Sequence, residues 1–354
     1  MDQLEMIGTL PRLFLETEKR NQHAIQEFFR SRFFALSGQK THSRLGTPLY
    51  HYSSSVSVEV LANYLRRERK SVTLIHPTFD NIPAILKRHD IQLLPIEEFA
   101  LRRPAKAIQS LTTDAIFLVL PNNPTGFQLT RAQFETLVRS CKEKGIVIIL
   151  DFSFRFFSSL TKWDQYEILL SNQSDFVCIE DTGKTWPALD LKIGFITASD
   201  SLYSELEQIT DDVLLNVSPF IFALLSRYIS IEQQLPIKET VSQLADHNRK
   251  ILRAELYDTP LKIANADSKI SVEWIKLPTV WDSVDFCEWL ESHQISVLPG
   301  NPFFWNQSER GRSYVRVALM RPREFFQRAA SQLRRATLEY SKKHPSVRGK
   351  QLTR

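Results

Sequence analysis

Cysteine is scarce in this sequence of 354 residues, and long apolar runs are absent from it. The three cysteines, Cys141, Cys178 and Cys287, do not have the spacing of a metal site. Such an odd, sparse count indicates a reducing compartment and no disulfide framework, so we expect a cytoplasmic protein without a bound metal. The N-terminus has no basic stretch followed by an apolar one, and runs such as residues 145–150 are far shorter than the roughly 20 residues that cross a bilayer. We therefore expect neither a signal peptide nor a membrane role.

The net charge is modest, and its distribution speaks against nucleic acid as a partner. The formal charge is +5, and much of the excess lies in residues 341–354. This segment is predicted to be a basic, flexible, solvated tail. A nucleic-acid interface needs basic residues interleaved with aromatic ones on a folded face, and no such pattern is visible. We expect no nucleic-acid partner.

Short apolar runs alternate with amphipathic helical stretches between about residues 55 and 200. The strand-like runs are at residues 71–76, 91–95, 115–120, 146–150, 176–179 and 193–198, and the helical ones are at 57–69, 80–89 and 130–144. Apolar strands separated by helices indicate a mainly parallel sheet that is covered on both faces. The predicted fold class is therefore α/β, with a large domain over residues 46–235.

The pattern changes after residue 235 and predicts a smaller α+β domain over residues 236–340. Helical stretches are expected at residues 238–257, at 280–293 and from 323 onward, and strands at 269–276, 295–298 and 314–319. We expect the N-terminal helical segment, residues 1–45, to pack with this smaller domain. No internal repeat is visible.

Three polar residues stand in an order that suits an aldehyde cofactor. Asn123 follows one predicted strand, Asp151 closes another, and Lys184 follows a third, which is where ligands bind in open α/β sheets. A lysine amine forms an imine with an aldehyde, a carboxylate keeps a pyridine nitrogen protonated, and an amide can hydrogen-bond a phenolic oxygen. Taken singly, the three could be a turn asparagine, a helix cap and a surface lysine. Their order together predicts pyridoxal 5'-phosphate (PLP), with Lys184 as the catalytic residue.

A serine-rich segment, residues 53–57, precedes a predicted helix and suggests a site for the PLP phosphate. Hydroxyl and backbone N–H groups at a helix N-terminus bind a phosphate dianion well, so we assign Ser55 and Ser57 to it. The alternative is an ordinary serine-rich helix cap. Lys192, eight residues after Lys184, is expected to supply a cation to the same phosphate.

Three further residues complete the predicted site. Phe79 follows a strand and could stack on the cofactor ring, and Ser153, two residues after Asp151, is expected to contact the cofactor. Arg316 could hold a substrate carboxylate through two parallel hydrogen bonds. The alternative for Arg316 is an ordinary strand arginine.

The order of amide, carboxylate, lysine, cation and arginine resembles the fold-type-I PLP enzymes of the aspartate aminotransferase superfamily over nearly the whole chain. The resemblance implies a homodimer. The motifs Tyr52-Ser-Ser-Ser-Val-Ser-Val-Glu59, His76-Pro-Thr-Phe-Asp-Asn81, Pro121-Asn-Asn-Pro-Thr-Gly126 and Glu180-Asp-Thr-Gly-Lys-Thr-Trp-Pro187, with Leu189-Asp-Leu-Lys192, are more closely similar to the PLP-dependent L-arginine oxidases. These include the arginine hydroxylase of enduracididine biosynthesis and arginine desaturases. The resemblance implies oxidation of L-arginine by dioxygen with PLP alone, to 4-hydroxy-2-oxo, 4,5-dehydro or 2-oxoarginine products.

Two departures from ordinary aminotransferases agree with this resemblance. Phe154 stands where most of them carry a tyrosine that bonds the phenolic oxygen, and Asp181 stands where they have a small hydroxyl residue near the phosphate. In the resemblance Asp181 binds the substrate guanidinium, which a charge-assisted contact makes reasonable. The alternative is that Asp181 pairs internally with Lys184 or Lys192.

The oxidases also have an N-terminal segment that covers the active site and contacts the substrate. Here only about ten residues precede the family-like pattern at Leu10-Pro11, so we expect most of this lid to be missing and simple 2-oxoarginine to be a larger share of the product. The main alternative function is a class I/II aminotransferase, or a PLP-dependent cyclase, acting on arginine or a related basic amino acid. A non-catalytic binding or regulatory protein of the same fold is a further alternative.

Overall fold

The computed structural model describes residues 3–186, 188, 190–234 and 241–345, which form two compact units. Unit 1 contains the described residues of Met1–Ile75, Asn81–Pro121 and Gln128–Val241. Unit 2 contains those of His76–Asp80, Asn122–Phe127 and Ser242–Arg354. The two short segments of unit 2 therefore come from the region that the sequence assigned to the large domain.

Unit 1 is built on a seven-stranded sheet in the order β1-β7-β6-β5-β4-β2-β3. Its strands are β1 (Leu49–His51), β2 (Val72–His76), β3 (Leu93–Glu97), β4 (Ala115–Val119), β5 (Val147–Asp151), β6 (Phe176–Asp181) and β7 (Gly194–Ala198). Strands β2, β4, β5 and β6 pair in parallel, and β7 runs antiparallel to both β6 and β1. The mainly parallel sheet predicted from the sequence is confirmed.

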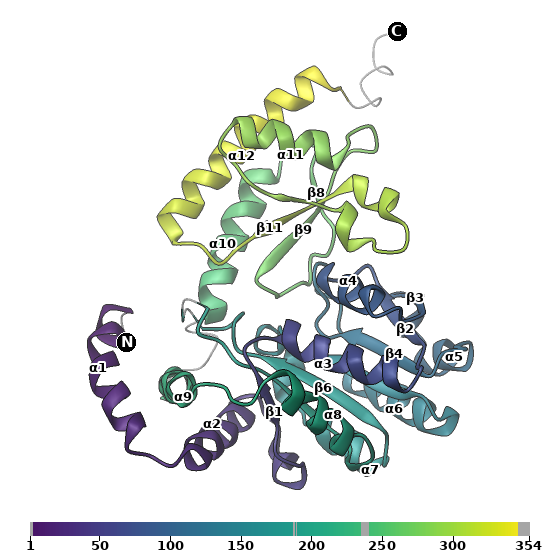
Figure 1. Ribbon diagram of the computed structural model, residues 1–354. Helices are drawn as coiled ribbons and strands as arrows, with labels where there is room; N and C mark the ends of the chain where they lie inside the picture. Colours follow the sequence, from purple (N-terminus) through teal and green to yellow (C-terminus); the bar gives the residue numbers. More distant parts are fainter. Residues whose placement is uncertain (1–2, 187, 189, 235–240, 346–354) are drawn as a thin grey trace. The chain divides into compact units, whose positions relative to one another are not determined.

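Helices cover both faces of this sheet, as an α/β fold requires. They are α1 (Gln3–Glu18), α2 (Gln22–Leu36), α3 (Ser54–Arg67), α4 (Asn81–Arg88), α5 (Pro104–Gln109), α6 (Arg131–Lys144), α7 (Gln165–Ser171), α8 (Asp200–Val213) and α9 (Pro219–Gln234). Helix α3 packs on β6 and β7, and α6 packs on β5 (Figure 1). The ends of α6 follow from its sequence: Thr130 and Gln133 form a capping box, and Gly145 ends the helix in the left-handed conformation.

The N-terminal helices differ from the sequence-based expectation, because α1 and α2 belong to unit 1 and pack on α9. The reason lies in the aromatic residues of α2. Phe29 packs against Phe195 and Phe222, and Phe33 against Phe195 and Phe156, and all of these rings lie in unit 1.

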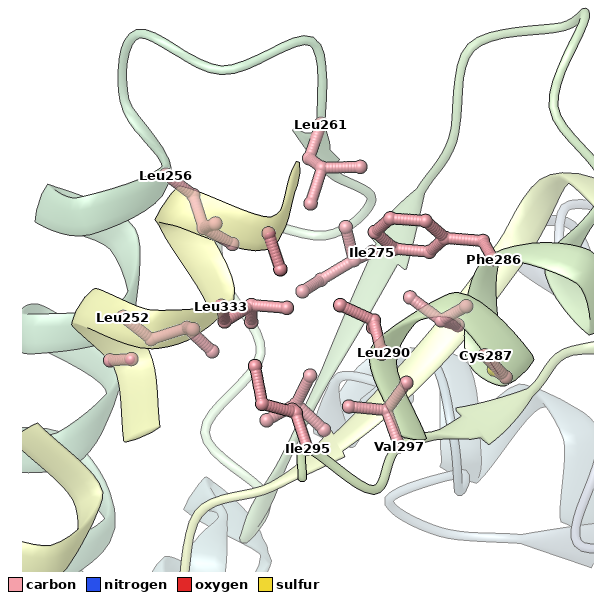
Figure 2. Close-up of a cluster of buried hydrophobic side chains, with 14 of the residues drawn as sticks. Leu252, Leu256, Leu261, Ile275, Phe286, Cys287, Leu290, Ile295, Val297 and Leu333 are labelled. Atoms are coloured by element: carbon pink, nitrogen blue, oxygen red, sulfur yellow. The ribbon is translucent and has the colours of Figure 1, made fainter. Parts of the chain in front are cut away.

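Unit 2 is an α+β structure with a four-stranded sheet in the order β10-β11-β9-β8. Its elements are α10 (Val241–Leu256), β8 (Lys262–Ile263), β9 (Val272–Lys276), α11 (Ser283–Ser292), β10 (Leu298–Pro299), β11 (Tyr314–Ala318) and α12 (Arg323–Lys343). Figure 2 shows its apolar core, in which Leu252, Leu290 and Leu333 from the three helices meet Ile275 of β9.

The first three residues of the predicted C-terminal tail, residues 341–343, are helical instead. Helix α12 continues to Lys343 because Tyr340 packs its ring against Trp281 and Phe286. The rest of the expected tail, residues 346–354, lies outside the described residues. Of the helices described, none is both long enough and apolar enough to cross a membrane.

Candidate active site

Asp151 is held at the carboxyl end of β5, between two parallel neighbours. The register places it beside Val119 of β4 and Ile179 of β6. The backbone N–H of Ser153 donates a 2.8 Å hydrogen bond to Asp151 Oδ1. The Ser153 hydroxyl is buried and makes no hydrogen bond of regular geometry within the described residues.

Burial and neighbouring charges determine the pKa of Asp151. Burial raises its pKa to about 6, the Ser153 contacts oppose the rise, and the negative charges of Asp181 and Glu180 add to it. A buried carboxyl group with this pKa would be stabilised as a carboxylate by a bound pyridinium N–H. The cofactor contacts predicted for Asp151 and Ser153 stay predictions.

Asp181 lies at the end of β6 and accepts two backbone hydrogen bonds. Ser54 N–H donates to its Oδ2 at 3.0 Å, and Gly183 N–H donates to its Oδ1 at 2.6 Å. Ser54 is the first residue of α3, so the carboxylate sits at the positive end of that helix. The carboxylate is thus fixed in place by backbone donors.

The N-terminus of α3 is close to β7 because residue 194 is glycine. A Cβ at Gly194 would lie 2.2 Å from the carbonyl carbon of Ser53 and 2.4 Å from the nitrogen of Ser54.

Of the two serines assigned to phosphate, Ser55 lies at the first turn of α3, and its hydroxyl accepts a hydrogen bond from Asn81 Nδ2 at 2.8 Å.

Ser57 is more enclosed than Ser55. It is fully buried, and its hydroxyl lies 2.9 Å from Nδ1 of His51. Burial lowers the pKa of His51 to about 4, so the ring is neutral at physiological pH and can accept this hydrogen bond. Ser57 thus fixes the start of α3, and its predicted contact with phosphate stays a prediction.

Lys184 lies in an exposed turn that follows β6. Thr182 fixes this turn to the start of β7, because its backbone N–H donates to Ile193 O at 2.9 Å and its hydroxyl accepts from Ile193 N at 2.8 Å. The lysine therefore extends from a rigidly attached base, as a residue that carries a cofactor requires.

Lys192 reaches the same end of the sheet. A Cβ at Gly183 would lie 2.6 Å from Lys192 Cδ and 3.1 Å from Asp181 Oδ1, so the lysine chain passes over the glycine beside Asp181. Its ammonium group pairs at 3.0 Å with Asp190, an exposed carboxylate. A surface pair of this kind contributes little free energy, so Lys192 can exchange this partner for a phosphate.

Unit 2 brings Asn123 and Arg316 together. Arg316 Nη1 donates to Asn123 Oδ1 at 3.2 Å, and its guanidinium lies 5.1 Å from the centre of the Phe303 ring. Burial lowers the pKa of Arg316, opposed by Asp80, but arginine remains a cation. The Asn123 amide oxygen thus accepts one hydrogen bond from Arg316, and its amide NH2 group supplies two donors.

Phe79 packs with an aromatic group in unit 2 that also contains Trp274, Phe303, Phe304 and Tyr314. The segment that carries it is fixed by a 3.0 Å hydrogen bond from Thr78 N–H to Phe303 O. Its predicted stacking on the cofactor ring stays a prediction.

The residues fit PLP on the chemistry of their donors. Within unit 1 there are an amine, a buried carboxylate of raised pKa and a helix N-terminus beside a lysine. Unit 2, taken by itself, contains an amide that accepts from a buried guanidinium. An aldehyde, a pyridine nitrogen, a phosphate and a phenolic oxygen are the groups that these side chains suit.

Sequence reasoning missed the contribution of Arg155 and Glu180 near this site. Both are fully buried, and Arg155 Nη2 lies 2.5 Å from Glu180 Oε1. The available signal was a charge within an apolar segment, since Glu180 directly follows Phe176-Val-Cys-Ile179 and Arg155 stands among phenylalanines.

The chain belongs to the aminotransferase class I and II family, whose model matches residues 23–332. Members of this family are PLP enzymes, so the chain is a PLP-dependent enzyme of the aminotransferase fold. Its solved structural relatives include MppP, in a structure soaked with the product 2-ketoarginine. The two are 33% identical, the match covers 95% of each chain, and the TM-score is 0.89.

More distant relatives are aminotransferases. The aspartate aminotransferase of Pyrococcus horikoshii is 23% identical over 229 residues, which are 64% of this chain and 57% of that protein. The histidinol-phosphate aminotransferase of Pyrococcus furiosus is 28% identical over 164 residues, 44% of this chain and 45% of that protein. The chain thus spans about half the length of the curated relatives it matches. The α-aminoadipate aminotransferase LysN of Thermus thermophilus, at 15% identity and a TM-score of 0.72 over 82% of this chain and 77% of LysN, shares the fold.

Proposed function

We propose that this PLP enzyme oxidises L-arginine with dioxygen and acts as a homodimer. The observation that carries the proposal is the similarity to MppP over 95% of both chains, since 2-ketoarginine is the product with which that protein was soaked. The anchored carboxylate of Asp181 supports it, because a fixed anion is suited to a guanidinium group.

In this proposal each polar residue has a defined task, and Lys184 has two. PLP, when bound, supplies an electron sink for a substrate that has lost its α-proton. Asp151 would hold the pyridine nitrogen, Asn123 the phenolic oxygen, and the start of α3 with Lys192 the phosphate. Lys184 Nζ would attach the cofactor and then take the α-proton of the substrate.

The substrate would be held at its two ends. Asp181 would accept hydrogen bonds from the guanidinium, and Arg316 would donate to the α-carboxylate. Phe154 has no hydroxyl with which to bond the phenolic oxygen, which leaves more electron density on the ring and favours electron transfer to dioxygen. The simplest balanced outcome is arginine, dioxygen and water giving 2-oxoarginine, ammonia and hydrogen peroxide.

The second candidate is an aminotransferase, or a PLP-dependent cyclase, that acts on arginine or a related basic amino acid. It is favoured by the curated relatives, several of which are aminotransferases. The site residues named above serve both candidates, and the acceptor of the electrons distinguishes them.

An oxygen electrode tests the proposal directly. We expect arginine to drive dioxygen consumption without a keto acid, with release of ammonia and peroxide and with 2-oxoarginine detected by mass analysis. Turnover that requires 2-oxoglutarate and continues under nitrogen would make the chain an aminotransferase and end the oxidase proposal.

Replacing Asp181 with alanine is expected to lower kcat/KM for arginine at least about tenfold, because a charge-assisted hydrogen bond contributes roughly 1.5–3 kcal/mol. For norleucine, which has no guanidinium, we expect a smaller loss. The comparison is made at saturating PLP, since the alanine variant also loses the contacts with the N–H groups of Ser54 and Gly183.

The matched control is Asp181→Asn, which keeps the shape and removes the charge. It should lose arginine selectivity to a similar extent as the alanine variant. Equal losses for arginine and norleucine in both variants would show that Asp181 serves the helix terminus or the cofactor instead.

A further inference from the structure

A fully buried polar network lies next to Asp151 and Asp181 in unit 1. Arg155 Nε donates to both oxygens of Glu180, at 3.1 and 3.0 Å, and Arg155 Nη1 donates to Gln165 Oε1. Tyr166 donates its hydroxyl hydrogen to Glu180 Oε1 at 3.0 Å, and Thr197 donates to Tyr166 at 2.9 Å. Every member but Thr197, which is 2% exposed, has no solvent exposure at all.

The network is attached to both segments that carry the candidate carboxylates. Arg155 lies four residues after Asp151, and Glu180 directly precedes Asp181 on β6. Successive side chains of a strand point to opposite faces, so Glu180 lies on the face opposite to Asp181. The ion pair therefore joins the segment after β5 to the end of β6, on the face of β6 opposite to Asp181.

Contacts lead from the ion pair to the carboxylate of Asp151. The guanidinium of Arg155 lies 3.9 Å from the centre of the Phe152 ring, and Arg155 N–H donates to Phe152 O at 2.8 Å. Phe152 N–H in turn donates to Ile179 O at 2.8 Å. Ser153 lies between Phe152 and Arg155, and its N–H donates to Asp151. Because both flanking residues are fixed, the direction of this N–H is fixed as well.

Stability alone gives no reason for such a pair. Two charges lose their hydration when they are buried, and apolar side chains of similar volume are often as stabilising or more so. Burial alone would lower the pKa of Arg155, and Glu180 beside it keeps that pKa raised, so the arginine stays a cation. Unlike apolar packing, the bidentate pair fixes the orientation of the two side chains relative to each other.

We propose that Arg155 and Glu180 are positioning residues that hold the segment after β5 so that Asp151 meets the cofactor's pyridine nitrogen. The inference rests on the role proposed above for Asp151. It does not depend on which substrate or electron acceptor the enzyme uses.

The test is a titration of PLP-free protein with PLP, followed by absorbance, for the variant Arg155→Lys. Lysine keeps the positive charge beside Glu180 but lacks the flat two-pronged donor set. We expect the Kd for PLP to rise at least tenfold. Arg249→Lys is the matched control, since Arg249 is a buried arginine that bonds Glu273 in unit 2. The melting temperature of Arg249→Lys should fall about as far as that of Arg155→Lys, whereas the Kd of Arg249→Lys for PLP should change less than twofold.

A double-mutant cycle separates positioning from a general structural effect. If Arg155 acts through Asp151, then Arg155→Lys should change the Kd for PLP less than threefold in an Asp151→Asn background. An equal loss in both backgrounds, or a Kd for Arg155→Lys within twofold of wild type, would overturn the proposal. A wild-type Kd in Asp151→Asn alone would instead overturn the role of Asp151.

If Arg155→Lys does not fold, Tyr166→Phe decides the matter. It removes one hydroxyl that donates to Glu180 and leaves the ion pair in place, so a rise of about threefold in the Kd for PLP is expected. An unchanged Kd in that variant would then overturn the proposal. The titrations use neither arginine nor dioxygen, so failure of the oxidase proposal leaves them intact.

Discussion

Replacing Lys184 with alanine is expected to lower turnover at least about 10³-fold, because in the proposed function Lys184 is both the amine that attaches PLP and the base that takes the α-proton. The near-visible absorbance of the PLP-loaded protein, which borohydride removes in the wild type, should be absent from the variant. Both losses follow from one nitrogen atom on a turn that Thr182 fixes to β7.

Lys192→Ala is the control for this prediction, because it removes a second lysine, eight residues further on, with the same change of charge. We expect it to bind PLP more weakly but to keep the borohydride-sensitive absorbance at saturating PLP. Oxidation of arginine by Lys184→Ala at near wild-type rate would refute the whole site assignment.

The second large effect concerns the pH dependence of stability. The pKa of Asp151 is raised by burial from 3.8 to about 6. A raised pKa means that the folded protein binds the proton more tightly than the unfolded chain. The resulting stability is fully present below about pH 4 and is lost as the pH rises through 6.

Asp151→Asn removes this loss, because asparagine does not ionise. In PLP-free protein, the free energy of unfolding of the variant relative to wild type should therefore increase by about 3 kcal/mol between pH 3.5 and pH 7.5. Urea unfolding at the two pH values measures it. With PLP bound at pH 7.5, wild type should be more stable than Asp151→Asn, since in the proposed function Asp151 then pairs with the pyridinium cation. A difference that is the same at both pH values would show that Asp151 ionises as freely in the folded protein as in the unfolded chain.

Much of the fold could be read from the sequence because its signals are local. The apolar runs that end at Asp151 and near Asp181 are β-strands, and the helix expected at residues 130–144 is α6, which Thr130 caps. Less was predictable where short elements depend on distant partners. The strand expected at residues 295–298 is reduced to β10 (Leu298–Pro299), and Ile295 and Val297 lie in the core of unit 2 (Figure 2). Of residues 295–299, only Leu298 and Pro299 pair with β11, which is a long-range contact that no local pattern shows.

The candidate site also has features that the sequence predicts and features that it does not. Residue type and order were enough to find Lys184, Asp151 and Asn123 as candidates. They could not show that Asn123 bonds Arg316, or that Asp181 accepts the N–H of Ser54, because these contacts join residues 193 and 127 positions apart. The segments 76–80 and 122–127 also cluster with unit 2, which no local pattern predicts.

The tight approach at Gly194 gives this sequence a vulnerable position that has no chemistry of its own. A single base change converts a glycine codon to an alanine codon, and the new methyl group would meet backbone atoms of Ser53 and Ser54 that cannot easily move. Over generations such a change would keep the lysine and the carboxylate but displace the start of α3, to which the proposed function assigns the cofactor phosphate. A lineage that loses the activity by drift can therefore still display every residue that a motif search looks for.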